Sequence, residues 1–377
     1  MGGKKKVLII LGIALLLIAA AVLIFVCRNL SHDYLHEDFL EKTGHKLGFH
    51  ADLAVLPDGS EIYYLEGPNN GPPLLLLHGQ QVNCLDYARV LPRLSEEFHV
   101  YALDYYGHGQ SSHNPDKYTA VAIGNDMIWF LENIMPGKAY IAGHSSGALL
   151  AAWVSARAPE NVIATVLEDG PFFSTLPGRA EKTISWLGFK NMHDYLNQDE
   201  IDTFMEYSLE HDYMQELFNA RDPQAWNKIV KDPALRYLTR HPGQIPKIWY
   251  YPPELGINAL YALNANMQDG TGHYDLRFGV SFYDFSWFAG FDQEEILKSI
   301  TVPVIVMQVA PNEMTAPLYH DANGILLAAM DEEDARRVVD LIPDSRYIGG
   351  FQSTHDIHAD LPDAYIEVLL DLKNNTQ

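Results

Sequence analysis

The stretch AGHSSGALLAAW places Ser145 between Gly143 and Gly147, in the pattern G-x-S-x-G. A serine on a sharp turn between a strand and a helix can act as a nucleophile toward an acyl carbonyl. The flanking glycines fit that turn, because Cβ atoms at 143 or 147 would crowd the neighbouring elements. The competing interpretation is a plain loop that caps a helix, and a random chain this long contains the pattern in roughly one case in ten. The context favours the nucleophile, since AYIAG before it is typical of a strand and GALLAAW after it of a helix.

The elements that must position Ser145 alternate between strands and helices. Apolar runs predict strands, and 3.6-residue periodicity predicts helices at 86–98, 118–135, 147–159, 331–342 and 362–373. A hairpin is expected at 53–67, around Pro57-Asp58-Gly59. This alternation indicates a parallel sheet with helices on both faces. The expected strands cover 72–79, 99–107, 138–143, 161–170, 301–309 and 345–351.

The alternation of strands and helices is interrupted once. Residues 174–298 carry helical segments and many aromatic side chains, and the strand pattern resumes at 301. We therefore expect a core formed by 51–173 and 299–377, with a helical cap inserted at 174–298. A long insertion at the carboxyl edge of a parallel sheet lies over the place where such sheets bind ligands.

Four motifs in chain order resemble those of the α/β-hydrolase fold superfamily. LLLLHGQQ resembles its H-G loop after the third strand, and LDYYGHGQSS its D-x-x-G-x-G-x-S turn. The G-x-S-x-G stretch resembles its nucleophile elbow, and STHDIHADLP the segment with its histidine. The resemblance implies a mostly parallel eight-stranded sheet, a cap domain, and a triad in the order serine, acid, histidine.

A serine hydroxyl needs a base to take its proton, and two histidines compete for that role. His355 follows the last expected strand in a loop, at the position of the family's histidine. His358 matches a second histidine often found three residues further on, for which packing or capping is the simpler role. The resemblance therefore favours His355 as the base.

The acid of the triad has two candidate locations in this family. Members commonly place an aspartate nine residues after the proline of the VPV strand, but that position here is Asn312, with Glu313 beside it. Others, such as haloalkane dehalogenases, use the end of the preceding core strand, where this chain has Asp169, next to Glu168. We favour Asp169, with Glu313 as the alternative and Glu168 behind both, because the acid must orient the imidazole and stabilise its positive form.

The same resemblance assigns the oxyanion hole to two backbone N–H groups. One belongs to Ser146, directly after the nucleophile, and the other to Gln80 in the loop after the third strand. The helix that begins at Ser146 also points its N-terminal N–H groups at the site, which favours a developing negative charge.

The N-terminal segment differs from the rest of the chain. Lys4, Lys5 and Lys6 precede residues 7–26, which carry no charged or polar side chain. As a helix this run is about 30 Å long, the thickness of the hydrocarbon core of a bilayer. Residues 1–28 are therefore predicted to be a retained transmembrane anchor, followed by a stalk at 29–50. The leading lysines favour a single-pass protein with its body outside the cytoplasm; secretion after cleavage is the alternative.

Composition limits the classes of partner and cofactor that the chain is expected to bind. The chain has 377 residues with 49 acidic and 26 basic ones, so its net charge of −23 argues against a nucleic-acid partner. Cys27 and Cys84 cannot form a disulfide framework, and no Cys/His spacing is typical of zinc. We expect neither a metal nor a cofactor, and composition leaves the oligomeric state unknown.

These observations together predict a serine hydrolase of esterase or lipase type, cleaving a carboxylic ester or related acyl bond through an acyl-enzyme. Ser145 in place of an aspartate disfavours epoxide hydrolase and haloalkane dehalogenase chemistry. The cap's aromatic residues suggest an apolar acyl substrate beneath an apolar ceiling, although a cap also needs aromatics for its own core. The alternative function is a non-catalytic binding module on the cell surface, because this fold also serves in that role. The residues expected to form this ceiling are Trp186, Trp226, Trp249, Tyr250, Tyr251, Phe285 and Trp287.

Overall fold

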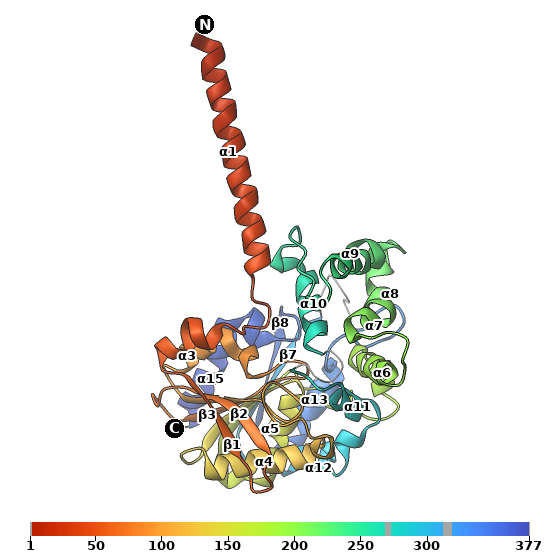
Figure 1. Cartoon of the computed structure of the whole chain (residues 1–377). Helices are drawn as coiled ribbons and strands as arrows, with labels where there is room; N and C mark the ends of the chain where they lie inside the picture. Colours follow the sequence, from red (N-terminus) through yellow and green to blue (C-terminus); the bar gives the residue numbers. More distant parts are fainter. Residues whose placement is uncertain (1, 268–272, 312–318, 377) are drawn as a thin grey trace.

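A computed structural model describes residues 2–267, 273–311 and 319–376. An eight-stranded sheet runs through the body in the order β1-β2-β4-β3-β5-β6-β7-β8. β1 and β2 pair antiparallel with their neighbours, and all other pairs are parallel, which confirms the predicted fold class (Figure 1). The strands are β1 (His50–Val55), β2 (Glu61–Glu66), β3 (Pro73–Leu77), β4 (His99–Leu103), β5 (Ala139–His144), β6 (Val162–Glu168), β7 (Val304–Val309) and β8 (Ser345–Phe351).

Helices cover both faces of the sheet, and each face has its own apolar core. One core contains side chains of α4, α5, α12 and α13; the other contains side chains of α3 and α15. The central strands β4, β5 and β7 are buried along their whole length, as their continuous apolar runs predict. These helices are α3 (Leu91–Leu94), α4 (Ala120–Asn133), α5 (Ser146–Arg157), α12 (Gln293–Ser299), α13 (Glu332–Leu341), α14 (Ile357–Asp360) and α15 (Pro362–Thr376).

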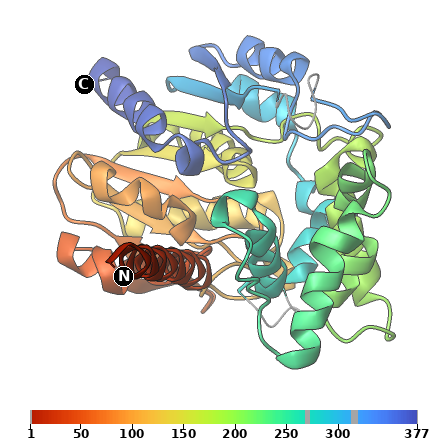
Figure 2. The ribbon, with the colours of Figure 1, turned by 90° about the horizontal axis from the view of Figure 1, so that it is seen from above.

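Between β6 and β7 the chain forms a set of helices that lie along one side of the body (Figure 2). α6 and α11 pack against each other and share the core of the adjacent sheet face through Phe189 and Phe282. α7, α9 and α10 enclose a separate apolar cluster that includes Trp226 and Tyr261. The helices are α6 (Ile184–Leu196), α7 (Phe204–His211), α8 (Met214–Asn219), α9 (Asp232–Arg240), α10 (Ile257–Asn266) and α11 (Leu276–Tyr283).

Short 3-10 and π-helical turns, together with the single α-helical turn α2, complete the described chain. Several of them begin or end a longer element, as 3-10 turns commonly do. They are η1 (Leu40–Gly44), α2 (His45–Leu47), η2 (Cys84–Arg89), η3 (Pro115–Lys117), η4 (Pro159–Asn161), η5 (Ala180–Lys182), η6 (Asn227–Lys231), η7 (Pro253–Leu255) and η8 (Ser286–Phe288).

The N-terminal helix α1 (Gly2–Ser31) projects from the body (Figure 1). Its segment Val7–Ser31 has a mean hydropathy of 3.4 in its most apolar window, and none of that window is buried in the protein. A helix of this length and composition can cross a membrane, and a signal sequence at the N-terminus has the same properties. The lack of protein contact shows that the helix is not a core helix of the body.

Candidate active site

Ser145 occupies a strained turn between β5 and α5. Its φ of 54° and ψ of −123° are rare for a residue with a side chain, and its N–H donates to the Glu168 carbonyl at 2.9 Å. The two glycines of the motif permit this turn. A Cβ at Gly143 would lie 2.2 Å from the Gly147 carbonyl oxygen, and one at Gly147 would lie 2.2 Å from that of Leu77. Strand and helix can therefore approach closely enough to hold the serine at the sheet edge.

Asp169 lies beside the serine because β5 and β6 are parallel and in register. His144 is paired with Glu168, so the next residue of each strand reaches the same edge of the sheet. Asp169 is fully buried with a φ of 40°, its N–H donates to the Met307 carbonyl at 2.9 Å, and its Oδ1 lies 3.4 Å from the N–H of Val309. These contacts fix the carboxylate at the carboxyl end of the sheet.

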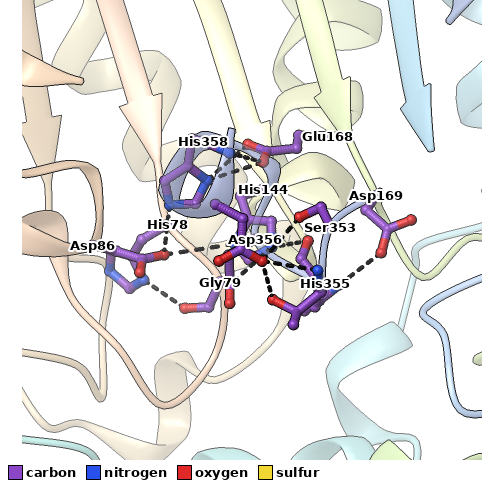
Figure 3. Close-up of polar contacts among 12 residues, drawn as sticks. His78, Gly79, Asp86, His144, Glu168, Asp169, Ser353, His355, Asp356 and His358 are labelled. Carbon is purple, nitrogen blue, oxygen red and sulfur yellow. Dashed lines mark hydrogen bonds and ion pairs between the residues drawn. The ribbon is translucent and has the colours of Figure 1, made fainter. Parts of the chain in front are cut away.

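His355 reaches Asp169 from the loop between β8 and α14. Its Nδ1–H donates to Asp169 Oδ2 at 2.7 Å (Figure 3). Burial by itself lowers the pKa of His355, but the hydrogen bond and charge of Asp169 outweigh it and raise the pKa to about 9. Because the side chain is 40% exposed, it also remains accessible from the solvent side. With Nδ1 committed to the carboxylate, Nε2 is the ring nitrogen left for proton transfer.

The loop that carries His355 is held by an acid that sequence analysis did not single out. Asp360 Oδ2 accepts hydrogen bonds from the N–H of Thr354 at 2.8 Å, from its hydroxyl at 2.5 Å, and from the Ser353 hydroxyl at 3.1 Å. A carboxylate that accepts several hydrogen bonds from one loop fixes that loop's conformation. Asp360 stands in the STHDIHADLP segment, but its role depends on the loop's conformation, which spacing does not reveal.

Ser145 and His355 line one cavity of about 310 Å³. Gln80 and Ser146, the expected sources of the oxyanion-binding N–H groups, line it too. The loop that contains Gln80 is tied to neighbouring elements: the Tyr274 hydroxyl donates to Gln80 Oε1 at 2.8 Å. The structure therefore brings the expected nucleophile, base and oxyanion loop to a single cavity. Glu313, the alternative acid, lies outside the described residues.

The apolar wall of this cavity differs from the aromatic ceiling expected from sequence. It is formed by smaller apolar residues and two phenylalanines, whereas none of the expected ceiling residues is among its described lining. Trp226 and Trp287 are buried in apolar cores instead, and Trp249 and Tyr250 are exposed. The cap's aromatics thus serve its own packing first. The apolar lining consists of Val82, Pro171, Ile184, Phe189, Leu263, Phe282, Leu327, Ala328 and Ala329.

A second cavity of about 230 Å³ adjoins the first. The two share Ile184, Leu327, Ala328 and His355, so the imidazole lies between them. Apolar residues such as Met214 dominate its lining. Together the cavities can accommodate apolar groups on both sides of His355.

Behind the candidate triad lies a buried network of acids and histidines (Figure 3). The N–H of His358 donates to Glu168 Oε1 at 2.8 Å, and its Nδ1 lies 3.0 Å from both oxygens of that carboxylate. Its Nε2 lies 3.2 Å from Asp86 Oδ2. Burial disfavours all three charges, but their mutual attraction outweighs it, holding the pKa of His358 well above its usual range and the pKa values of both acids below theirs. Glu168 is thus committed to His358, which leaves Asp169 for His355.

The network extends to His144, directly before the serine. His144 Nε2 lies 3.2 Å from Asp356 Oδ1, and Nδ1 lies 3.6 Å from Asp86 Oδ2. Within the described part of the chain, donor atoms of Asp86, His144 and His358 lie within 4.8 Å of one another, so they could hold a metal ion. An imidazolium at His358 already supplies one positive charge between the carboxylates of Asp86 and Glu168, which balances one of the two negative charges without an ion. Sequence analysis expected no metal, and spacings of 58 and 214 positions gave no signal for this grouping.

Comparisons with known proteins bear on the family and the fold of the chain. The profile of the alpha/beta hydrolase fold family matches residues 72–317. The bifunctional esterase/perhydrolase DCH of Acinetobacter calcoaceticus is 26% identical over 269 residues, which cover 68% of this chain and 83% of that protein. Curated relatives of higher identity match over shorter stretches, and the chain spans between 26% and 54% of their length.

Two solved structures show the shared fold. The esterase RhEst1 from Rhodococcus sp. ECU1013 has a TM-score of 0.58 at 17% identity, over 87% of this chain and 99% of that one. A membrane phospholipase A, described as a novel bacterial virulence factor, has a TM-score of 0.55 at 19% identity, over 99% of both chains. The second match therefore includes the N-terminal helix as well as the body.

Proposed function

The chain belongs to the alpha/beta hydrolase fold family, and from that premise we propose that it is a serine hydrolase acting through an acyl-enzyme. Its relatives support hydrolysis as the class of reaction. The observation that carries the proposal is the shared cavity of Ser145 and His355, with His355 hydrogen-bonded to Asp169. A hydroxyl, an imidazole and a buried carboxylate in this order are what acyl transfer requires.

In the proposed reaction, neutral His355 takes the proton of the Ser145 hydroxyl through Nε2 as Oγ attacks the carbonyl carbon. The N–H groups of Gln80 and Ser146 stabilise the oxyanion of the tetrahedral intermediate. The imidazolium then gives its proton to the leaving alcohol, and the acyl group remains on Ser145. A water molecule, activated by the same imidazole, releases the acid and restores the serine. Asp169 orients the ring and stabilises its positive form throughout.

We assign the acid of the triad to Asp169. Its hydrogen bond to His355 supports this choice over Glu168, which is equally buried but contacts His358. The burial also strengthens the pairing, because little water competes for the carboxylate.

We propose that the substrate is a carboxylic ester with an apolar acyl group. The cavity beside Ser145 supports this class, because most of the residues facing it from the cap and from the loop before α13 are apolar.

We further propose that residues 7–26 anchor the protein in a membrane, with the cap and sheet domain outside the cytoplasm. The domain limits proposed from sequence, with the cap at 174–298, include α6–α11 and all but the last residue of α12.

Hydrolysis of p-nitrophenyl esters of increasing chain length by purified wild-type protein and by Ser145→Ala tests the proposed function. We expect turnover by the wild type alone, with a preference for apolar acyl chains. A folded wild-type protein that cleaves none of these esters would instead support the binding-module alternative.

A further inference from the structure

Exposed apolar side chains gather in one short segment of the cap. Among the described residues beyond α1, eleven large apolar side chains are exposed, and four of them lie between 245 and 255. These four, which we call the 245–255 patch, are Ile245, Trp249, Tyr250 and Leu255. Scattered exposed apolar residues are normal on a protein surface, but a group of this density, with two aromatics, indicates a contact surface.

The 245–255 patch is attached to the end of α1. The Arg28 guanidinium forms an ion pair with Glu254, and the side-chain amide of Asn29 donates to the Trp249 carbonyl at 2.8 Å. Asn29 is fully buried by this contact. Figure 1 shows this part of the cap beside the point where α1 enters the body. The patch therefore sits at the level of residues 28 and 29 along the axis of the helix.

This level corresponds to the membrane interface. The apolar run ends at Val26, so Arg28 lies about 3 Å further along the helix at 1.5 Å per residue. The polar interfacial layer on each side of a bilayer is about 5–7 Å thick. Tryptophan and tyrosine concentrate in this layer, because each has an apolar ring with a polar edge. Trp249, Tyr250 and their aliphatic neighbours thus have the composition of an interfacial anchor at interfacial depth.

The charges next to the patch do not favour anionic lipids. Arg28 is already paired with Glu254, Lys247 is the one basic residue between 245 and 255, and the chain as a whole carries a charge of −23. Attraction to an anionic surface needs a cluster of unpaired basic residues. Contact through apolar insertion into a zwitterionic bilayer is the interaction that these residues support.

We infer that the 245–255 patch inserts into the membrane that holds α1 and presents bilayer-borne acyl esters to the active site. This inference rests on the proposed anchoring and on the proposed function. α10 begins directly after the patch and ends at the catalytic cavity, since Leu263 lines that cavity and Asn266 donates to the Gln81 carbonyl at 2.8 Å. Ten residues of helix span about 15 Å, so a lipid tail enters the protein close to where the cap meets the bilayer.

The position of the patch can be measured with a fluorescent probe. Cys27→Ser removes the exposed thiol and Cys84 is buried, so an added cysteine becomes the one labelled. Leu255→Cys and Val55→Cys are matched sites, because both residues are 58% exposed, and β1 lies on the side of the body away from α1 (Figure 1). In full-length protein reconstituted into phosphatidylcholine vesicles, we expect lipid-attached nitroxides to quench an environment-sensitive dye at position 255 and not at 55. Equal quenching at both positions would overturn the inference.

Activity separates this inference from the proposed function. Trp249→Ala with Leu255→Ala should leave hydrolysis of a soluble short-chain ester unchanged and lower hydrolysis of the same ester group on a vesicle-embedded lipid by fivefold or more. Leu53→Ala with Val55→Ala, on the distant edge strand, should change neither rate. Equal rates for the patch variant and the wild type on the embedded ester would contradict the inference alone. A wild type inactive on both substrates would contradict the proposed function.

Discussion

The Nδ1 atom of His355 lies 2.7 Å from Oδ2 of Asp169, although 186 positions separate the two residues in the chain. The contact depends on β6 and β7 ending at the same edge of the sheet and on the loop after β8 folding back over that edge. It commits Nδ1 to the carboxylate, which leaves Nε2 as the ring nitrogen available to Ser145, a residue that lines the same cavity.

Asp169→Asn should lower kcat for a short-chain p-nitrophenyl ester by a hundredfold or more, because an amide neither stabilises the imidazolium nor holds the required tautomer. Glu313→Gln is the control and should retain near-normal kcat. Steady-state kinetics of both variants measure the difference. A large loss of kcat confined to Glu313→Gln would assign the role of the triad acid to Glu313 instead.

The pH profile should report the shifted histidine. Because Asp169 raises the pKa of His355 to about 9 and the neutral ring is the base, kcat/KM should rise with pH to a midpoint near 9. In Asp169→Asn the midpoint should move down toward 6.5, the ordinary histidine value. The raised pKa also means that protonated His355 contributes to the free energy of unfolding. This contribution is fully present below pH 6.5 and is lost as the pH rises through about 9. An identical midpoint in both proteins would show that His355 is not the titrating base.

His358→Ala should destabilise the protein by about 3–5 kcal/mol, because Glu168 and Asp86 would remain buried without their cation. Adding Glu168→Gln should restore part of the loss by removing one of the unpaired charges. Urea unfolding in detergent micelles, followed by tryptophan fluorescence, measures both values. A loss below about 1 kcal/mol in the single variant would mean that the network carries no such charge pairing.

Two glycines provide a matched test of the elbow. Gly147→Ala would place a Cβ 2.2 Å from the Leu77 carbonyl oxygen, so we expect a loss of about 3 kcal/mol or failure to fold. Gly188→Ala in α6 meets nothing within 4 Å and should be neutral or stabilise by up to about 1 kcal/mol. Thermal unfolding of the two variants compares them directly. Equal stability would contradict the close approach of α5 to β3.

The fold could be predicted from sequence because its signals are local: apolar runs, helical periodicity and four motifs in order. The resemblance favours Asp169 as the acid, but it does not reveal that Glu168 contacts a different histidine, because successive residues at a strand end point in different directions and the register decides which one meets which histidine. The role of Asp86 could not be predicted either, because this residue lies next to His358 only in the folded protein. Trp249 was misplaced in the cavity ceiling because an aromatic residue has the same sequence signal whether it lines a pocket or faces outward.

Covalent labelling tests the central proposal most directly. The wild-type protein is treated with a fluorophosphonate, and intact mass and peptide mapping locate the adduct. We predict one phosphonyl group, on Ser145, and no labelling of Ser145→Ala. A folded wild-type protein that never reacts, or an adduct on a different residue that persists in Ser145→Ala, would contradict the assignment of this serine as the nucleophile.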